Sequence, residues 1–93
     1  LVLLVEPFSA LDARMRLAMQ DLAADLLRGR SVLMVTHDPA EAARLSDQIH
    51  LLTESGLSDA RAPDSPSPRP PNDPAVLACQ GALLSRLIAG AGA

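Results

Sequence analysis

The chain has 93 residues and a formal net charge of −3, with a pI of about 5.1. This length allows at most one small domain, and the acidic balance gives no attraction for nucleic acid, so we expect no nucleic-acid partner. All eight basic residues are arginine, and a P-loop needs a lysine for the β- and γ-phosphates, so the chain cannot contain a working P-loop. The single cysteine, Cys79, excludes an internal disulfide and a cysteine-based zinc site, and we expect no resident metal site.

The first third of the chain predicts a buried strand followed by a helix. Residues 1–5 are a continuous apolar run that ends at Glu6 and Pro7, which is typical of a parallel-sheet strand buried on both faces. A helix is predicted from about Asp12 to Arg28, with Ser9 as a hydroxyl cap and Gly29 as its end. The predicted apolar stripe of this helix is Met15, Met19, Leu22 and Leu26.

The middle of the chain continues the alternation. Residues 31–36 predict a second buried strand, and a short helix follows, capped by Asp38 and reaching about Leu45. Residues 48–53 are a third strand candidate. The order strand, helix, strand, helix, strand predicts an α/β fold with a parallel sheet of about three strands and flanking helices.

The composition changes after residue 53. Residues 54–74 contain six prolines among small and polar residues and predict a flexible linker, for which a plain spacer is favoured over an SH3-type peptide ligand. Residues 75–89 return to a helical pattern, followed by a frayed tail to residue 93. The apolar face predicted for this helix is Val76, Cys79, Leu83 and Leu87. We therefore divide the chain into residues 1–53, 54–74 and 75–93.

Two polar residues follow the first two predicted strands. Glu6 ends the first, and His37 follows the second. Taken singly, Glu6 is more often a solvated acid in a turn, and His37 a polar residue that fills a strand-to-helix turn. If the two strands are neighbours, about 5 Å apart, the two side chains converge on one crevice, a geometry that suits activation of a water molecule.

These motifs resemble those of ABC-transporter ATPases. Residues 1–12, which read Leu-Val-Leu-Leu-Val-Glu-Pro-Phe-Ser-Ala-Leu-Asp, resemble the Walker B strand and D-loop, and Met34-Val35-Thr36-His37-Asp38 resembles the switch or H-loop. The resemblance covers about residues 1–53 and implies a partial P-loop NTPase (RecA-like) fold. No Walker A loop, Q-loop or signature sequence is present, so the chain looks like a C-terminal fragment that starts at Walker B.

The resemblance implies a role for each matching residue. Glu6 matches the catalytic glutamate that polarises the attacking water, and His37 matches the switch histidine that contacts the γ-phosphate. Four residues match the D-loop, which reaches across a dimer to the partner's ATP site: Ser9, Ala10, Leu11 and Asp12. Val5 stands where the family has the Walker B aspartate that helps hold Mg²⁺, and an isopropyl group has no lone pair to offer the ion.

The details of the motifs are similar to importers of the nitrate, sulfonate and taurine group and to importers of a thiamine precursor, hydroxymethylpyrimidine. The resemblance therefore implies ATP and Mg²⁺ in the parent protein, a second ATPase subunit, permease subunits and a periplasmic substrate-binding protein. It implies a cytoplasmic position on the inner face of the plasma membrane. We expect no ATP binding or hydrolysis by this chain alone. Two alternatives are a non-enzymatic remnant or pairing module for an intact ATPase and, far behind, an unrelated small α/β binding domain.

Overall fold

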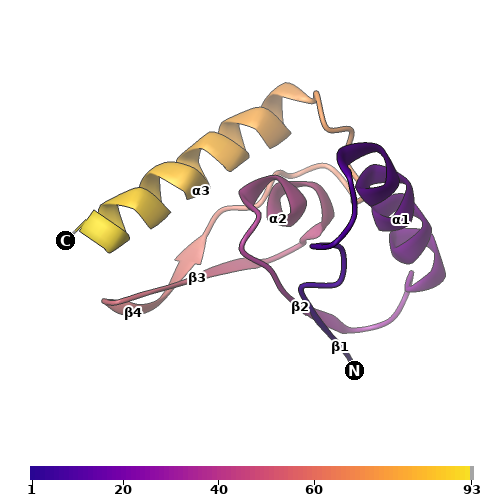
Figure 1. Cartoon of the computed structure of the whole chain (residues 1–93), viewed down its shortest axis with the longest axis horizontal. Helices are drawn as coiled ribbons and strands as arrows, with labels where there is room; N and C mark the ends of the chain where they lie inside the picture. The colour runs from indigo at the N-terminus through magenta and orange to yellow at the C-terminus, as the bar shows by residue number, and fades with distance from the viewer. Residues whose placement is uncertain (93) are drawn as a thin grey trace. The chain divides into compact units, whose positions relative to one another are not determined.

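A computed structural model describes residues 1–92 of the chain. These residues form two compact units, Leu1–His37 and a second unit that begins at Asp38. Both units can be followed by colour in Figure 1. Among the described residues, no helix is both long enough and apolar enough to cross a membrane.

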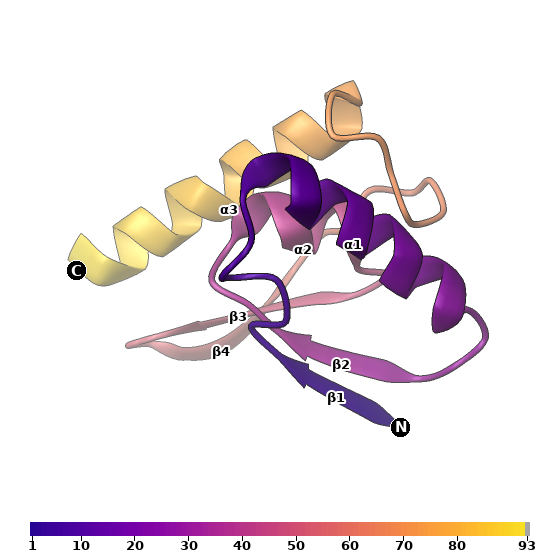
Figure 2. The ribbon, with the colours of Figure 1, turned by 45° about the vertical axis from the view of Figure 1, so that its right-hand side comes forward.

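The first unit is a parallel strand pair joined by a helix. Strand β1 (Val2–Val5) pairs with β2 (Val32–Val35), and Val5 lies opposite Val35. Helix α1 (Ala13–Leu26) carries the chain from the end of β1 back toward the start of β2, as Figure 2 shows. This is the connection that a parallel pair requires, because a tight turn can only join antiparallel strands. The first two predicted strands and the helix between them are therefore present.

The apolar residues of the first unit are more exposed than the sequence predicts. Leu3 is 60% exposed, Val5 63% and Leu33 53%, so these strands are not buried on both faces. The predicted stripe of α1 is also open, since Leu22 is 48% exposed and Leu26 68%. The physical reason is that these side chains belong to a sheet of two strands, which is too small to cover its own faces.

The second unit contains helix α2 (Pro39–Leu45), strands β3 (Ile49–Thr53) and β4 (Gly56–Ala60), and helix α3 (Pro74–Gly92). Strand β3 pairs antiparallel with β4, with Thr53 opposite Gly56. The prediction that β3 is a third strand of the parallel sheet is therefore wrong. The two-residue connection returns the chain directly beside β3, and Gly56 supplies the positive φ of +109° that this turn needs.

The core of the second unit lies between α3 and the hairpin. The buried residues Ile49, Leu51 and Leu83 form one cluster, with Cys79 and Leu87 packed against it. Val76, on the same helix face, is 1% exposed. The predicted apolar face of α3 is therefore confirmed. The helix reaches Gly92, past the expected end at residue 89, and residue 93 lies outside the described residues.

The proline-rich stretch, residues 54–74, contains β4 and a buried arginine. Arg69 is 2% exposed, and its guanidinium donates to four backbone carbonyls, those of Ala43, Ser46, Pro63 and Ser65, at 2.7–3.0 Å. Two of these carbonyls lie at the C-terminal end of α2, where helix carbonyls have no partner within the helix. Arg69 therefore attaches this stretch to α2. A peptide ligand for an SH3-type domain would need this arginine to be accessible.

Candidate functional site

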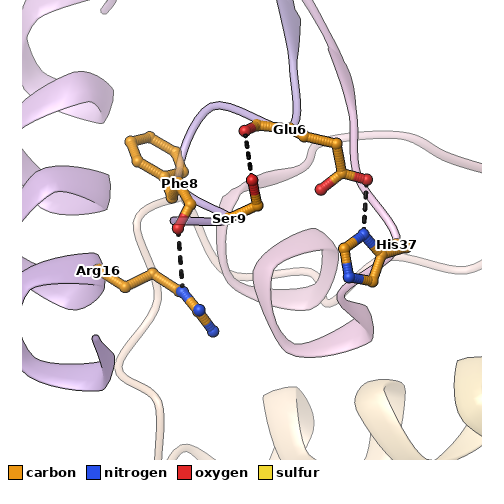
Figure 3. Close-up of polar contacts among 5 residues, drawn as sticks. All are labelled: Glu6, Phe8, Ser9, Arg16 and His37. Carbon is orange, nitrogen blue, oxygen red and sulfur yellow. Dashed lines mark hydrogen bonds and ion pairs between the residues drawn. The ribbon is translucent and has the colours of Figure 1, made fainter. Parts of the chain in front are cut away.

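Glu6 and His37 meet at the carboxyl end of the parallel strand pair. The Glu6 backbone N–H donates to the carbonyl of Val35 at 2.7 Å, which continues the ladder one residue past the strand. From this position, the Glu6 carboxylate Oε1 lies 2.7 Å from His37 Nδ1, as Figure 3 shows. The two residues are 31 positions apart in sequence, and the parallel pairing of β1 with β2 brings them together.

The pair is accessible from solvent. The His37 side chain is 81% exposed and that of Glu6 32% exposed. When the imidazole is neutral, its Nδ1–H donates a hydrogen bond to the carboxylate. When the imidazole is protonated, the same contact becomes an ion pair. In both cases the hydrogen bond orients the ring. The carboxylate can accept a hydrogen bond from a water molecule, and the ring can donate from Nε2 to an anion when it is protonated.

The backbone at Glu6 adopts the left-handed conformation. Its φ is +48°, which is uncommon for a residue with a Cβ atom and costs about 1–2 kcal/mol. Hydrogen bonds hold the residue there, because its carbonyl accepts from the Ser9 N–H at 3.4 Å and from Ser9 Oγ at 3.2 Å. Strain of this kind, maintained by surrounding contacts, is common at functional sites.

A second turn follows the first and is held by an arginine. The Leu11 N–H donates to the carbonyl of Phe8 at 3.2 Å. Arg16 of α1 donates from Nε to the Phe8 carbonyl at 3.3 Å and from an Nη to the Leu11 carbonyl at 2.9 Å. Figure 3 shows the first of these contacts beside the Glu6–His37 pair. The loop from Glu6 to Asp12 is thus two consecutive turns with defined hydrogen bonds.

The start of α1 differs from the prediction. Asp12, not Ser9, is the N-cap, since its carboxylate accepts from the Met15 N–H at 2.8 Å. Ser9 instead closes the turn on Glu6. The second helix begins as predicted, with Asp38 accepting from the Ala40 N–H at 3.0 Å and Pro39 in its first position. Ser9, Ala10 and Asp12 are exposed, and Leu11 is half-buried.

Comparison with known proteins finds relatives along nearly the whole chain. An uncharacterized ABC transporter ATP-binding protein of Haemophilus influenzae is 46% identical over 92 residues, which cover 94% of this chain and 38% of that protein. The aliphatic sulfonates import ATP-binding protein SsuB 1 of Nocardia farcinica is 48% identical, covering 97% of this chain and 38% of the relative. This chain is homologous to ABC transporter ATP-binding proteins.

The homology concerns the C-terminal part of these proteins. A third relative, SsuB 2 of Xanthomonas axonopodis, is 43% identical over 95% of this chain, which spans 31% of its length. The chain thus spans less than two fifths of the relatives it matches. Because at least 94% of the chain is covered, the similarity to ABC ATP-binding proteins extends well past residue 53. No family model matches the chain, and no solved structure matches it.

The residues of this chain do not fit a magnesium site. Val5, at the position where the resemblance to ABC ATPases places an aspartate, has an apolar side chain that is 63% exposed. Within residues 1–92, no three side chains of histidine, cysteine, aspartate or glutamate are grouped so that they could hold a metal ion. Mg²⁺ binds through oxygen ligands, which valine cannot provide.

Sequence reasoning missed Arg16 and Arg69. Arg14 and Arg16 lie near the N-terminal end of α1, whose first turn holds no acidic residue and where the helix dipole disfavours a cation. An arginine in such a position suggests a specific acceptor, and the acceptors of Arg16 include two loop carbonyls. Nothing in the sequence around Arg69 signalled its buried position. Burial raises the pKa of the Cys79 thiol, and the nearby Arg69 cation partly offsets this effect.

Proposed function

We propose that this chain is the part of an ABC importer's ATP-binding subunit that carries the Walker B strand, the D-loop and the H-loop. The observation that carries the proposal is the 2.7 Å contact between Glu6 and His37 at the ends of paired parallel strands. The carboxyl edge of a parallel sheet is where α/β proteins bind ligands. The identities of 43–48% with ABC transporter ATP-binding proteins support the same assignment.

In this proposal, each residue of the site has a distinct role. The Glu6 carboxylate accepts a hydrogen bond from the attacking water and so makes its oxygen more nucleophilic. In its protonated form, His37 donates from Nε2 to the γ-phosphate, where negative charge accumulates during phosphoryl transfer. The D-loop residues Ser9–Asp12, three of which are exposed, face a second ATPase subunit.

The phosphate cradle must come from elsewhere in the complete subunit. The chain has no lysine, so it lacks the cation that a P-loop places against the β- and γ-phosphates. We therefore assign this chain no ATP hydrolysis on its own. The exposed apolar residues of β1 and β2 would then be covered by further parallel strands and helices of a P-loop NTPase sheet.

The transported molecule in this proposal is an aliphatic sulfonate. Relatives from Nocardia farcinica, Xanthomonas axonopodis and Rhodococcus jostii are named as aliphatic sulfonates import ATP-binding proteins. The subunit would work as a pair, on the cytoplasmic face of permease subunits that receive the sulfonate from a substrate-binding protein. Nitrate, taurine and the thiamine precursor are the competing substrates, and uptake of each by cells that carry the complete transporter distinguishes them.

Val5 favours a second candidate function. A subunit without the Walker B carboxylate binds its Mg²⁺·ATP with one ligand fewer near the phosphates. Such a subunit would pair with an intact ATPase and contribute its D-loop while hydrolysing little ATP itself. The rate of ATP hydrolysis by the purified complete subunit distinguishes the two candidate functions. Substantial hydrolysis supports the first, and very slow hydrolysis supports the second.

Calorimetry with ATP and Mg²⁺ tests the assignment, using this chain and the complete subunit that contains it. We expect heat of binding from the complete subunit and none from the 93-residue chain, because the phosphate cradle lies outside this sequence. A complete subunit that fails to bind ATP would contradict the proposed function. Micromolar binding by this chain alone would contradict the separate location of the phosphate cradle.

A further inference from the structure

Arg16 is the side chain that connects helix α1 to the loop beside Glu6. It lies in the first turns of α1 and is half-buried, with its side chain directed back toward the preceding loop (Figure 3). Its Nε donates to the Phe8 carbonyl at 3.3 Å and an Nη donates to the Leu11 carbonyl at 2.9 Å. One rigid group therefore links both ends of the turn from Phe8 to Leu11.

The chemistry of this link requires a guanidinium. Its N–H groups lie in one plane at fixed angles, so they can reach two carbonyl oxygens at once. A lysine ammonium keeps the charge but is a single point donor on a flexible stem. The Phe8 carbonyl also accepts from the Leu11 N–H, so the arginine adds to a turn that the backbone already forms.

The turn that Arg16 holds continues directly into the turn that holds Glu6. Ser9, the residue after Phe8, donates from both its N–H and its Oγ to the Glu6 carbonyl. These bonds maintain Glu6 at a φ of +48°, a conformation that a residue with a Cβ atom leaves readily when its contacts weaken. In this conformation, the Glu6 carboxylate lies within 2.7 Å of His37.

We propose that Arg16 is a positioning residue for the Glu6–His37 pair. By fixing the Phe8 and Leu11 carbonyls, it places Ser9 so that Ser9 can hold the Glu6 backbone, and the backbone conformation in turn aims the carboxylate at His37. In this account, Arg16 acts on the pair through the turn from Phe8 to Leu11. Its consequence for ATP hydrolysis rests on the proposed function, whereas its effect on the contact does not.

The test is the ¹⁵N NMR spectrum of the histidine side chains in the full 93-residue chain. His37 Nδ1 reports the contact with Glu6, and Glu6→Gln gives the spectrum of the weakened contact. His50 is an internal control, because its Nδ1 lies 2.8 Å from Asp59 Oδ1 in the second unit. The variants are Arg16→Met and Arg16→Lys, with Arg14→Met as the matched control, since Arg14 is an exposed arginine on the same helix.

We expect both Arg16 variants to move the His37 Nδ1 resonance toward its position in Glu6→Gln, while His50 and the backbone amides of α1 stay in place. Arg14→Met should leave His37 unchanged. An unmoved His37 in Arg16→Met would overturn the proposal. An unmoved His37 in Arg16→Lys would show that charge, and not the two-carbonyl link, is what matters. Loss of the α1 amide signals in the Arg16 variants would show that Arg16 is needed for folding of the helix. This result would also overturn the proposal.

A second measurement uses the complete ATPase subunit. We expect Arg16→Met to lower kcat for ATP hydrolysis and leave the Kd for ATP unchanged, because Arg16 acts on the orientation of Glu6 and not on the phosphate cradle. An increased Kd with unchanged kcat would contradict the positioning role. If the unsubstituted subunit fails to hydrolyse ATP at all, the proposed function fails, and the NMR result still decides the role of Arg16 at the Glu6–His37 contact.

Discussion

Arg44 and Arg69 are joined by two hydrogen bonds that run in opposite directions. The Arg69 N–H donates to the Arg44 carbonyl at 3.0 Å, and Arg44 Nε donates to the Arg69 carbonyl at 2.7 Å. The two residues are 25 positions apart, and both are less than 5% exposed. This reciprocal contact fixes the stretch that follows β4 against the C-terminal end of α2.

Arg69→Met tests how much the buried Arg69 guanidinium contributes to stability. The substitution leaves the carbonyls of Ala43, Ser46, Pro63 and Ser65 without their donor. We expect the free energy of unfolding to fall by about 2–4 kcal/mol, since each hydrogen bond to a charged group contributes about 1.5–3 kcal/mol and backbone adjustment recovers part of this. Urea unfolding followed by circular dichroism measures the loss. Arg61→Met, at an exposed arginine of the same unit, should change stability by less than about 0.5 kcal/mol.

Leu83→Ala tests the core of the second unit. Leu83 is 3% exposed and packs with Ile49 and Leu51, so its truncation leaves a cavity. We expect a loss of about 2–5 kcal/mol in the free energy of unfolding. The neighbouring Leu84 is 48% exposed, and Leu84→Ala is the matched control with a small effect. Equal losses for the two variants would mean that α3 does not present the Leu83 face to the hairpin.

Glu6→Gln tests the catalytic role in the complete subunit. An amide keeps the size of the side chain but removes the negative charge that attracts a proton from water. We expect ATP hydrolysis to fall by about 10²–10⁴-fold, the usual contribution of a general base, with ATP binding retained. Steady-state turnover and equilibrium binding of ATP measure the two effects. Turnover within a factor of two or so of the unsubstituted protein would rule out Glu6 as the base.

Val5→Asp tests the missing magnesium ligand. In the complete subunit, we expect this substitution to raise turnover and to lower the Mg²⁺ concentration needed for half of the maximal rate, because a carboxylate supplies the oxygen that valine lacks. Leu3→Asp is the matched control, since Leu3 lies two residues earlier on the same exposed face of β1. Unchanged turnover in Val5→Asp would show that the valine does not limit hydrolysis.

Cys79 allows a test of burial through pH. Because burial raises the pKa of its thiol, the folded chain holds less thiolate at pH 8 than the unfolded chain does. We therefore expect iodoacetamide to react more slowly with Cys79 in buffer than in urea, with the rate in buffer reaching half of its maximum at a higher pH. The free energy of unfolding changes accordingly. The contribution of this thiol is fully present below its pKa in the unfolded chain and is lost as the pH rises through its higher pKa in the folded chain. Equal rates in buffer and urea would contradict the packed position of Cys79.

The local elements of this protein follow from short-range sequence patterns. The apolar runs before Glu6 and His37, the Asp38 cap and the helical spacing of Val76, Leu83 and Leu87 each predict an element that the structure contains. Strand β4 was missed, although Ser55-Gly56 between two short runs is a turn signal. The cap at Ser9 was misassigned because Ser9 and Asp12 are both good N-caps, and the hydrogen bonds of the Glu6 turn decide between them.

By itself, the sequence determined which residues end the first two strands and therefore that Glu6 and His37 are candidates for one site. The sequence also sufficed to recognise the resemblance to ABC-transporter ATPases, because that resemblance rests on the motifs and their spacing along the chain. Only the tertiary structure decided that β3 turns back on β4, that Arg69 is buried among carbonyls and that Arg16 holds the loop beside Glu6. The two arginines donate to carbonyls outside their own helix or turn, and no local propensity encodes which carbonyl a given arginine will meet.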